Sequence, residues 1–263
     1  MKISFFNTNT LRIGLFCLFA GCISPCQSLP STVYVGGYLF PPFVQIDDNN
    51  AISGLTLDLI DLFNRSQSDF EFHFILTSPN RRYRDFERGI FDALFFENKQ
   101  WSWQGHDIVE SQTFLSGGEV FITQAKKNRK QSYFEDLSQK EIVAILGYHY
   151  NFANSITNPT ELRKRFNIRL VNSARTIINQ IKTGKSDIGI TTYSYLQTQF
   201  KHNPDLHSKI LVSEKFDQVY KHKILLRKQH SLTIKAVNEI LDKVSKDGSL
   251  NELLGRYGLK PLK

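Results

Sequence analysis

The stretch from Val35 to Ser66, VGGYLFPPFVQIDDNNAISGLTLDLIDLFNRS, constrains the fold most, because it predicts a strand, a turn and a helix in succession. Two glycines and two prolines end the strand, since proline lacks the amide hydrogen that a strand pairs with. After Gly54, apolar residues recur at helical spacing. A turn that follows a strand and carries aromatics such as Tyr38 and Phe40 is where open α/β folds bind ligands. The alternative is an aromatic plug beneath a surface turn.

The rest of the chain alternates short apolar runs with helical patterns. Strands that alternate with helices at this spacing predict βαβ units and a mostly parallel sheet, so the expected fold class is α/β. The expected strands cover residues 70–76, 91–96, 119–123, 142–146, 168–171, 187–191 and 223–226, and helices are expected to begin near residues 55, 81, 158, 173, 193, 232 and 249.

Several segments resemble one known family. They are residues 36–43 and 54–59, the G-x-x-D-A motif at 89–93, and the closing text VNEILDKVSKDGSLNELLGRYG. The resemblance is to the bacterial extracellular solute-binding proteins of family 3, the periplasmic binding proteins of polar amino acid transporters. It extends over nearly all of residues 33–260.

The resemblance implies a two-lobed periplasmic binding protein fold of type II, in which each lobe is a mostly parallel sheet flanked by helices. Two hinge strands are expected to cross between the lobes, near Lys126 and Tyr220. Lobe 1 is expected to comprise residues 30–125 plus 220–263, and lobe 2 residues 126–219. The last helices are expected to pack on the first lobe.

Residues 1–28 are expected to be a signal peptide. An apolar run of eleven residues, 13–23, is too short to span a bilayer and is typical of a secretory segment. All three cysteines lie within residues 1–28, so a mature chain from about Leu29 has none, which suits an oxidising compartment. The expected location is therefore the periplasm. A glycine before Cys22 resembles a lipoprotein cleavage box, and lipid anchoring at Cys22 is the alternative.

The chain is basic, with a formal charge of +8 that falls to +6 without Lys2 and Arg12. Its basic clusters are short, at residues 81–84, 126–130 and 163–165. Short, interrupted clusters are typical of solvated surface rather than of a nucleic-acid site. We therefore expect no nucleic-acid partner, no integral membrane segment after the signal peptide, and a monomer.

The resemblance also implies a ligand site between the lobes. Phe40 occupies the position of the aromatic that stacks on the ligand. The family's arginine that binds the α-carboxylate corresponds, by a count without gaps, to Gln104, and Trp101 replaces the threonine of that motif. The aspartate that binds the α-ammonium corresponds to Thr192. Both charged groups of an amino acid site are therefore expected to be missing, so free amino acids should bind weakly.

Other residues are expected to supply the site. Arg81 follows a proline, as an arginine does in divergent members, although it can also be a surface residue. Tyr148, in the segment Gly147–Tyr150, can stack on the ligand or donate a hydrogen bond. Glu97 lies near two tryptophans, where it can bind a cation or amine. With Tyr38, these complete the expected ligand-binding set.

The expected function is capture of a small polar or aromatic solute, for an ABC-type transporter with an inner-membrane permease complex. Two alternatives stay open: a periplasmic ligand sensor, and a cleft enzyme resembling a dehydratase, with Glu97 as general acid. The sequence contains no metal-ligand spacing, nucleophile elbow or phosphate loop. We therefore expect no catalytic residue, no metal and no cofactor.

Overall fold

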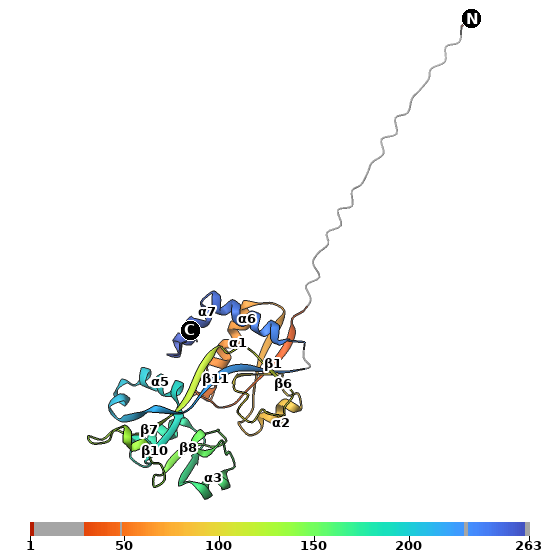
Figure 1. Cartoon of the computed structure of the whole chain (residues 1–263). Helices are drawn as coiled ribbons and strands as arrows, with labels where there is room; N and C mark the ends of the chain where they lie inside the picture. The colour runs from red at the N-terminus through yellow and green to blue at the C-terminus, as the bar shows by residue number, and fades with distance from the viewer. Residues whose placement is uncertain (3–28, 48, 229–230, 261–263) are drawn as a thin grey trace.

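The computed structural model has a two-lobed α/β fold, as Figure 1 shows, and the predicted fold class is confirmed. The predictions of a signal peptide and of lipidation at Cys22 fall on residues outside the described part of the chain, apart from residues 1 and 2. The structure describes residues 1–2, 29–47, 49–228 and 231–260.

The elements follow in chain order. The strands are β1 (Ser31–Gly37), β2 (Gln45–Ile46), β3 (Ile52–Ser53), β4 (Phe70–Leu76), β5 (Ala93–Glu97), β6 (Ile108–Glu110), β7 (Leu115–Gln124), β8 (Ile142–Ile145), β9 (Ile168–Val171), β10 (Ile188–Thr192) and β11 (Ile210–Arg227). The helices are α1 (Leu55–Ser66), α2 (Arg82–Glu87), α3 (Pro159–Arg165), α4 (Ala174–Lys182), α5 (Tyr193–His202), α6 (Ile234–Lys246) and α7 (Ser249–Arg256), with 3-10 turns η1 (Gln131–Phe134), η2 (Asn151–Ala153) and η3 (Pro204–Ser208).

The main sheet continues from one lobe into the other. Its strand order is β4-β1-β5-β11-β7-β10-β8-β9, with β6 beside β11. At each end the strands are parallel: β1 pairs with β4 and β5, and β8 pairs with β9 and β10. In the middle, β11 is antiparallel to β5 and β7. Helices supply the connections between the parallel strands, as βαβ units require.

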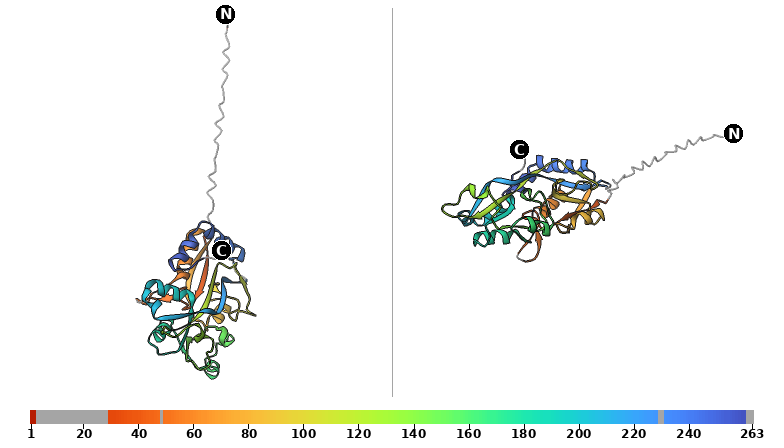
Figure 2. Two further views of the ribbon diagram at one scale, coloured as in Figure 1. Left: turned by 60° about the vertical axis from the view of Figure 1, so that its left-hand side comes forward. Right: turned by 60° about the horizontal axis from the view of Figure 1, so that its bottom comes forward.

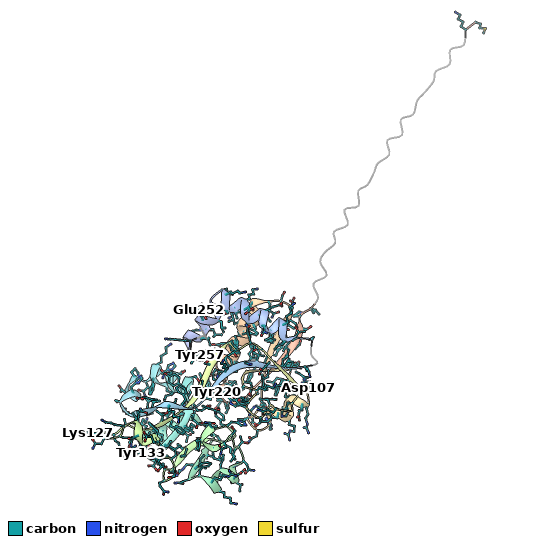
Figure 3. All side chains as sticks on the ribbon, in the orientation of Figure 1. Asp107, Lys127, Tyr133, Tyr220, Glu252 and Tyr257 are labelled. Carbon is teal, nitrogen blue, oxygen red and sulfur yellow. The ribbon has the colours of Figure 1, made fainter. Side chains whose placement is uncertain are left out.

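The two longest strands join the lobes. β7 and β11 pair from Leu115 opposite His222 to Gln124 opposite Ile210, with irregular register near Phe216. The sequence analysis found only the end of β11 and the middle of β7, because polar residues interrupt the alternation in the rest of β11. In Figure 3, Tyr220 lies where the lobes meet, and Lys127 and Tyr133 lie at the outer end of the second lobe.

The apolar cores lie on either side of this junction. One cluster includes Val33, Leu115 and Leu226, together with the C-terminal helices. Two further clusters pack against the sheet of the second lobe and include Val120 and Ile122 of β7. The predicted lobe limits, 30–125 plus 220–263 and 126–219, stay a prediction, and these cores favour a first crossing near residue 118 rather than near Lys126.

The C-terminal helices pack on the first lobe. α6 and α7 contact α1, and the Tyr257 hydroxyl donates to Asp58 over 2.8 Å. Both views in Figure 2 show these blue helices beside the orange N-terminal elements. Gly248 is the N-cap of α7, and the carboxylate of Asp247 accepts a hydrogen bond from the Ser249 amide. Among the described helices, none has the length and apolar character needed to cross a bilayer.

We expect Gly118→Ala to destabilise the protein by about 1–3 kcal/mol, because the added methyl has no room. A Cβ at Gly118 would lie 2.5 Å from the Phe216 ring and 2.6 Å from the Gln218 carbonyl oxygen, and a paired backbone cannot move aside. Gly255→Ala is the matched control: nothing lies within 4 Å of its Cβ position, so we expect a gain of up to about 1 kcal/mol. Urea unfolding measures both, and equal effects would contradict the prediction.

Candidate functional site

A narrow cavity lies between the lobes. About 260 Å³ of open space separates the lining atoms, but only about 20 Å³ is open to the centre of a water molecule, which is room for about one water. The lining residues come from the turn after β1, from α2, from the loop after β5, from β7 and from the turn after β8. They are Tyr38, Phe40, Arg82, Trp101, Glu119, Gly147, Tyr148 and His149.

The turn after β1 is fixed by backbone hydrogen bonds. The amide of Phe40 donates to Val44 over 2.9 Å, and the amide of Leu55, at the start of α1, donates to Pro42 over 3.0 Å. This pairing presents the Phe40 ring to the cavity. On the opposite lobe, Gly147 ends β8 with a φ of +81°, a left-handed conformation that favours glycine, and so turns Tyr148 back toward the first lobe.

Aromatic rings form most of the wall. The ring centroid of Phe40 lies 5.7 Å from that of Trp101 and 5.5 Å from that of Tyr148, both edge-on, and 5.9 Å from that of Tyr38. Such contacts stabilise each pair by about 0.5–1.5 kcal/mol beyond the area they bury. The packed rings also exclude water from the cavity. Electrostatic interactions inside it are therefore stronger than in water.

A buried ion pair supports this wall. Arg82 Nε lies 3.0 Å from Glu97 Oε1, and the two side chains are 2% and 0% exposed. Arg82 also donates to the carbonyl of Pro79, and its guanidinium lies over the Tyr38 ring. The indole N–H of Trp103 donates to Glu97 Oε2 over 3.1 Å. Burial raises the pKa of Glu97, while Arg82 and Trp103 oppose that rise.

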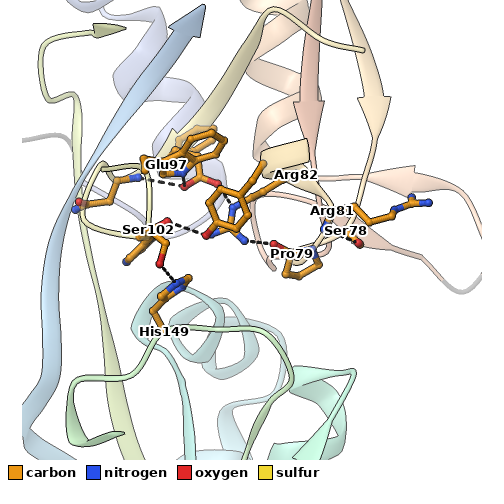
Figure 4. Close-up of polar contacts among 12 residues, drawn as sticks. Ser78, Pro79, Arg81, Arg82, Glu97, Ser102 and His149 are labelled. Atoms are coloured by element: carbon orange, nitrogen blue, oxygen red, sulfur yellow. Dashed lines mark hydrogen bonds and ion pairs between the residues drawn. The ribbon is translucent and has the colours of Figure 1, made fainter. Parts of the chain in front are cut away.

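Arg81 does not reach the cavity. Figure 4 shows Arg81 pointing away from the site and Arg82 pointing toward Glu97. Arg81 is exposed, whereas Arg82 is buried and lines the cavity. Neighbouring residues at the start of a helix point about 100° apart, so the one-residue difference decides which arginine is buried. The interpretation of the 81–84 cluster as solvated surface is accordingly wrong for Arg82.

Three other expected site residues lie outside the cavity lining. Gln104 is exposed and lines an outer groove with Lys99. Thr192 is buried and caps α5, and its hydroxyl donates to the Pro41 carbonyl over 3.2 Å. Glu97 lies behind the lining, paired with Arg82. Tyr38, Phe40, Trp101 and Tyr148 are brought together as expected, and their contact with a ligand stays a prediction.

Polar contacts connect the lobes across the cavity. The Tyr148 hydroxyl donates to the Leu39 carbonyl over 2.9 Å. The Ser102 hydroxyl and His149 Nε2 are hydrogen-bonded at 2.9 Å, as Figure 4 shows. His149 is buried, and burial lowers its pKa to about 4. Together with the hydrogen bond from Thr192 to the Pro41 carbonyl, these contacts hold side chains of the second lobe against the first lobe.

His222 lies behind the aromatic wall. It is fully buried, and its ring centroid is 4.7 Å from that of Phe43. Its Nδ1 donates to the Phe96 carbonyl over 2.8 Å, and among the described residues its Nε2 has no hydrogen-bond partner. Burial lowers its pKa to about 3, so the ring is neutral at physiological pH.

Glu119 was not singled out from the sequence. It lies on β7, is 2% exposed, and accepts a hydrogen bond from the Tyr220 hydroxyl over 3.1 Å. Burial raises the pKa of its carboxyl well above the usual value. The sequence signal was an acidic residue placed between two glycines, Gly117 and Gly118, and the largely apolar run VFIT at residues 120–123. In the described part of the chain, no group of three or more potential metal ligands occurs.

Two lobes joined by paired strands, with a buried cavity lined from both, define a periplasmic-binding-protein type of ligand-binding fold. The chain belongs to the bacterial extracellular solute-binding proteins, family 3, whose family model matches residues 34–260. The family resemblance predicted from the sequence is thereby confirmed. A comparison with curated proteins found no match.

Solved structures share the fold at low sequence identity. An ancestral arginine-binding protein bound to arginine has a TM-score of 0.66 at 19% identity, covering 88% of this chain and 99% of its own. The probable amino-acid ABC transporter extracellular-binding protein ytmK from Bacillus subtilis has a TM-score of 0.66 at 17% identity, covering 87% of this chain and 97% of its own. The ancestral amino acid-binding protein AncCDT-1, a precursor of cyclohexadienyl dehydratase, has a TM-score of 0.64 at 16% identity, covering 86% of this chain and 95% of its own.

We expect Arg82→Met to destabilise the protein by about 3–5 kcal/mol, because it leaves the Glu97 carboxylate buried without its cation. Arg81→Met, one residue away and exposed, is the matched control and should change stability by no more than about 0.5 kcal/mol. Arg82→Met combined with Glu97→Gln should recover part of the loss. Chemical denaturation measures all three, and an equal effect of the two arginine substitutions would refute the assignment of the buried pair.

Stability should decline in acid partly through His222. The unfolded imidazole takes up a proton below about pH 6.5, whereas the folded one stays neutral down to about pH 3. Stability is therefore fully present above pH 6.5 and falls as the pH drops, by about 2 kcal/mol from this group at pH 5.

His222→Gln, which keeps an N–H for Phe96, should remove that part of the slope of unfolding free energy between pH 7 and pH 5. Parallel slopes for the parent protein and His222→Gln would count against the neutral, buried ring.

Proposed function

We propose that the protein is a periplasmic solute-binding protein that captures a small solute between its lobes and delivers it to an ABC-type permease complex in the inner membrane. The observation that carries this proposal is the buried cavity lined by Tyr38, Phe40 and Trp101 from one lobe and by Tyr148 and His149 from the other. A buried, mostly aromatic cleft with a few polar groups is the usual form of a small-molecule site. The proposed acting form is a monomer.

The proposed mechanism is hinge closure about β7 and β11. A solute that contacts both lobes binds the closed arrangement more tightly and shifts the population toward it. The hydrogen bonds from Tyr148 to Leu39 and from Ser102 to His149 stabilise that arrangement in addition to the ligand. A permease then recognises the closed lobes and the protein releases the solute on opening.

The proposed solute is not a standard free amino acid. Gln104 and Thr192 are uncharged, so neither supplies the charged contact of the corresponding family residue. Gln104 is also exposed, and the Thr192 hydroxyl already donates to the Pro41 carbonyl. Each missing charge-assisted contact weakens binding by roughly 1.5–3 kcal/mol. Several similar structures bind amino acids by their descriptions, including arginine and glutamine, so amino acids belong in any test panel.

Binding is favoured over catalysis by the state of Glu97. The dehydratase alternative needs a carboxylic acid free to transfer a proton in the cleft, and Glu97 was its candidate. Its two oxygens instead contact Arg82 and the Trp103 N–H. A periplasmic sensor would use the same cavity, and neighbouring genes for a kinase rather than for a permease and an ATPase would favour that role.

A thermal-shift screen tests the proposal. Amino acids, amines, carboxylates and short peptides are added to the purified protein, and a true ligand raises the melting temperature in proportion to the logarithm of its excess over Kd. Tyr148→Ala should reduce the affinity of such a ligand at least tenfold. Tyr193→Ala, an aromatic that is 41% exposed on α5, should not change it. A protein that no small solute stabilises, or a ligand indifferent to Tyr148, would reject the proposed function.

A further inference from the structure

One ionisable group in the cavity lining lacks a partner of opposite charge. Glu119 pairs across the sheet with Thr192 of β10 and with Gln218 of β11, at the junction of the lobes. Its Oε1 accepts the hydrogen bond from Tyr220. Its Oε2 is buried and has no hydrogen-bond partner among the residues that the structure describes. A buried carboxyl oxygen left unsatisfied costs about 1–3 kcal/mol or more, so it is informative at a cavity wall.

The groups that face Glu119 do not supply a cation. Asp217 and Tyr220 face it from β11, and Tyr148 and Tyr150 from the turn after β8. Beyond burial, the Tyr220 hydroxyl lowers the pKa of Glu119, the acidic Asp217 raises it, and the nearby Gln218 side chain lowers it. The Gln218 amide N–H donates to the His149 carbonyl rather than to Oε2 of Glu119. No ion pair joins Glu119 to a basic side chain in the described part of the chain.

The other charges of the cavity are already balanced. Arg82 is paired with Glu97 at 3.0 Å, so this pair adds no net charge. The imidazole of His149 is neutral because burial lowers its pKa to about 4. Ionisation of Glu119 therefore adds to the cavity lining a negative charge that no side chain of the lining neutralises.

The walls around Glu119 are also suited to a cation. Phe40, Trp101 and Tyr148 line the same cavity as Glu119. Aromatic faces attract organic cations, and the attraction grows when water is excluded. A carboxylate-bearing ligand would instead add a second negative charge beside Glu119, with Arg82 already engaged.

We propose that the solute is a small organic amine without a carboxylate, whose ammonium group donates a hydrogen bond to Oε2 of Glu119 between the rings of Phe40, Trp101 and Tyr148. This inference rests on the proposed function and names the ligand class of the same cavity. The narrow cavity limits the amine to a compact one, unless the lobes separate further around it. Glu119 thus replaces Glu97, which the sequence suggested for an amine.

Calorimetry with four probes tests the ligand class. Benzylamine and n-butylamine carry the ammonium, benzyl alcohol replaces it by a neutral donor, and benzoate carries a carboxylate. We expect the amines to bind the purified protein at least tenfold more tightly than benzyl alcohol, and benzoate not to bind. The loss of one charge-assisted hydrogen bond corresponds to about a ten- to hundredfold change in Kd.

Glu119→Gln tests the residue. The amide keeps the shape and the oxygen of the neutral acid but cannot balance an ammonium. We expect it to weaken amine binding ten- to hundredfold and to leave benzyl alcohol unaffected. Glu161→Gln, on the far helix α3 where the carboxylate pairs with Arg165, is the matched control and should bind amines like the parent.

A proton count separates charge balance from a loss of fit. Burial raises the pKa of Glu119, and pairing with an ammonium requires the ionised carboxylate, so any proton on the acid is lost when the amine binds. Amine affinity should therefore rise between pH 5.5 and pH 8, where both amines stay protonated. Binding at pH 7 should release a proton, seen as an enthalpy that depends on the buffer, and Glu119→Gln should abolish both effects.

Two results would overturn the inference while leaving the proposed function intact. One is a benzyl alcohol affinity equal to that of benzylamine, or amine binding unchanged in Glu119→Gln, which would mean that Oε2 is satisfied by a bound water. The other is Tyr148-dependent binding of amino acids or benzoate without binding of amines. If no compound of any class binds, the inference and the proposed function fail together.

Discussion

The pairing of β7 with β11 is the constraint on which the rest of the structure depends. These strands are the only antiparallel pair of their length in the described chain, and each contributes to both lobes. They carry Glu119, Tyr220 and His222 to the back of the cavity. Gly117 and Gly118 have no side chains, so β7 and β11 approach closely where the lobes join. The space that a Cβ would need at either glycine is filled by atoms of β11. The hinge and the polar floor of the site are therefore one structural feature.

Burial governs the chemistry of the cavity. Removing water costs a charged group several kcal/mol unless a partner or a proton compensates. Three responses to burial occur side by side: Arg82 and Glu97 compensate each other, His149 and His222 are neutral, and the pKa of Glu119 is raised. The ion pair and the neutral histidines add no net charge to the site, so they need no ligand to balance them. The third leaves Glu119 as a group whose ionised form a cationic ligand can stabilise, so Glu119 has the strongest influence on which ligand the cavity selects.

The sequence predicted much of the fold and part of the site, and the misses have a common cause. The turn carrying Tyr38 and Phe40 was recognisable because strand-ending residues and aromatics are local signals. The family resemblance pointed to Arg81, but its neighbour Arg82 is the buried arginine, because only the start of α2 decides which of the two points inward. Glu119 was not predicted, because the sequence of a strand shows which residues share a face of the sheet but not which other segments cover that face.

The sequence by itself determined the α/β class, the family and the aromatic character of the cleft, since periodicity, turn residues and local motifs are properties of neighbouring residues. Only the tertiary structure decided which charges lose water. His222 receives its solvent-free surroundings from residues more than a hundred positions away, including the carbonyl of Phe96 that it contacts. Burial depends on the segments that pack around a residue, so the state of each charge follows from the completed fold.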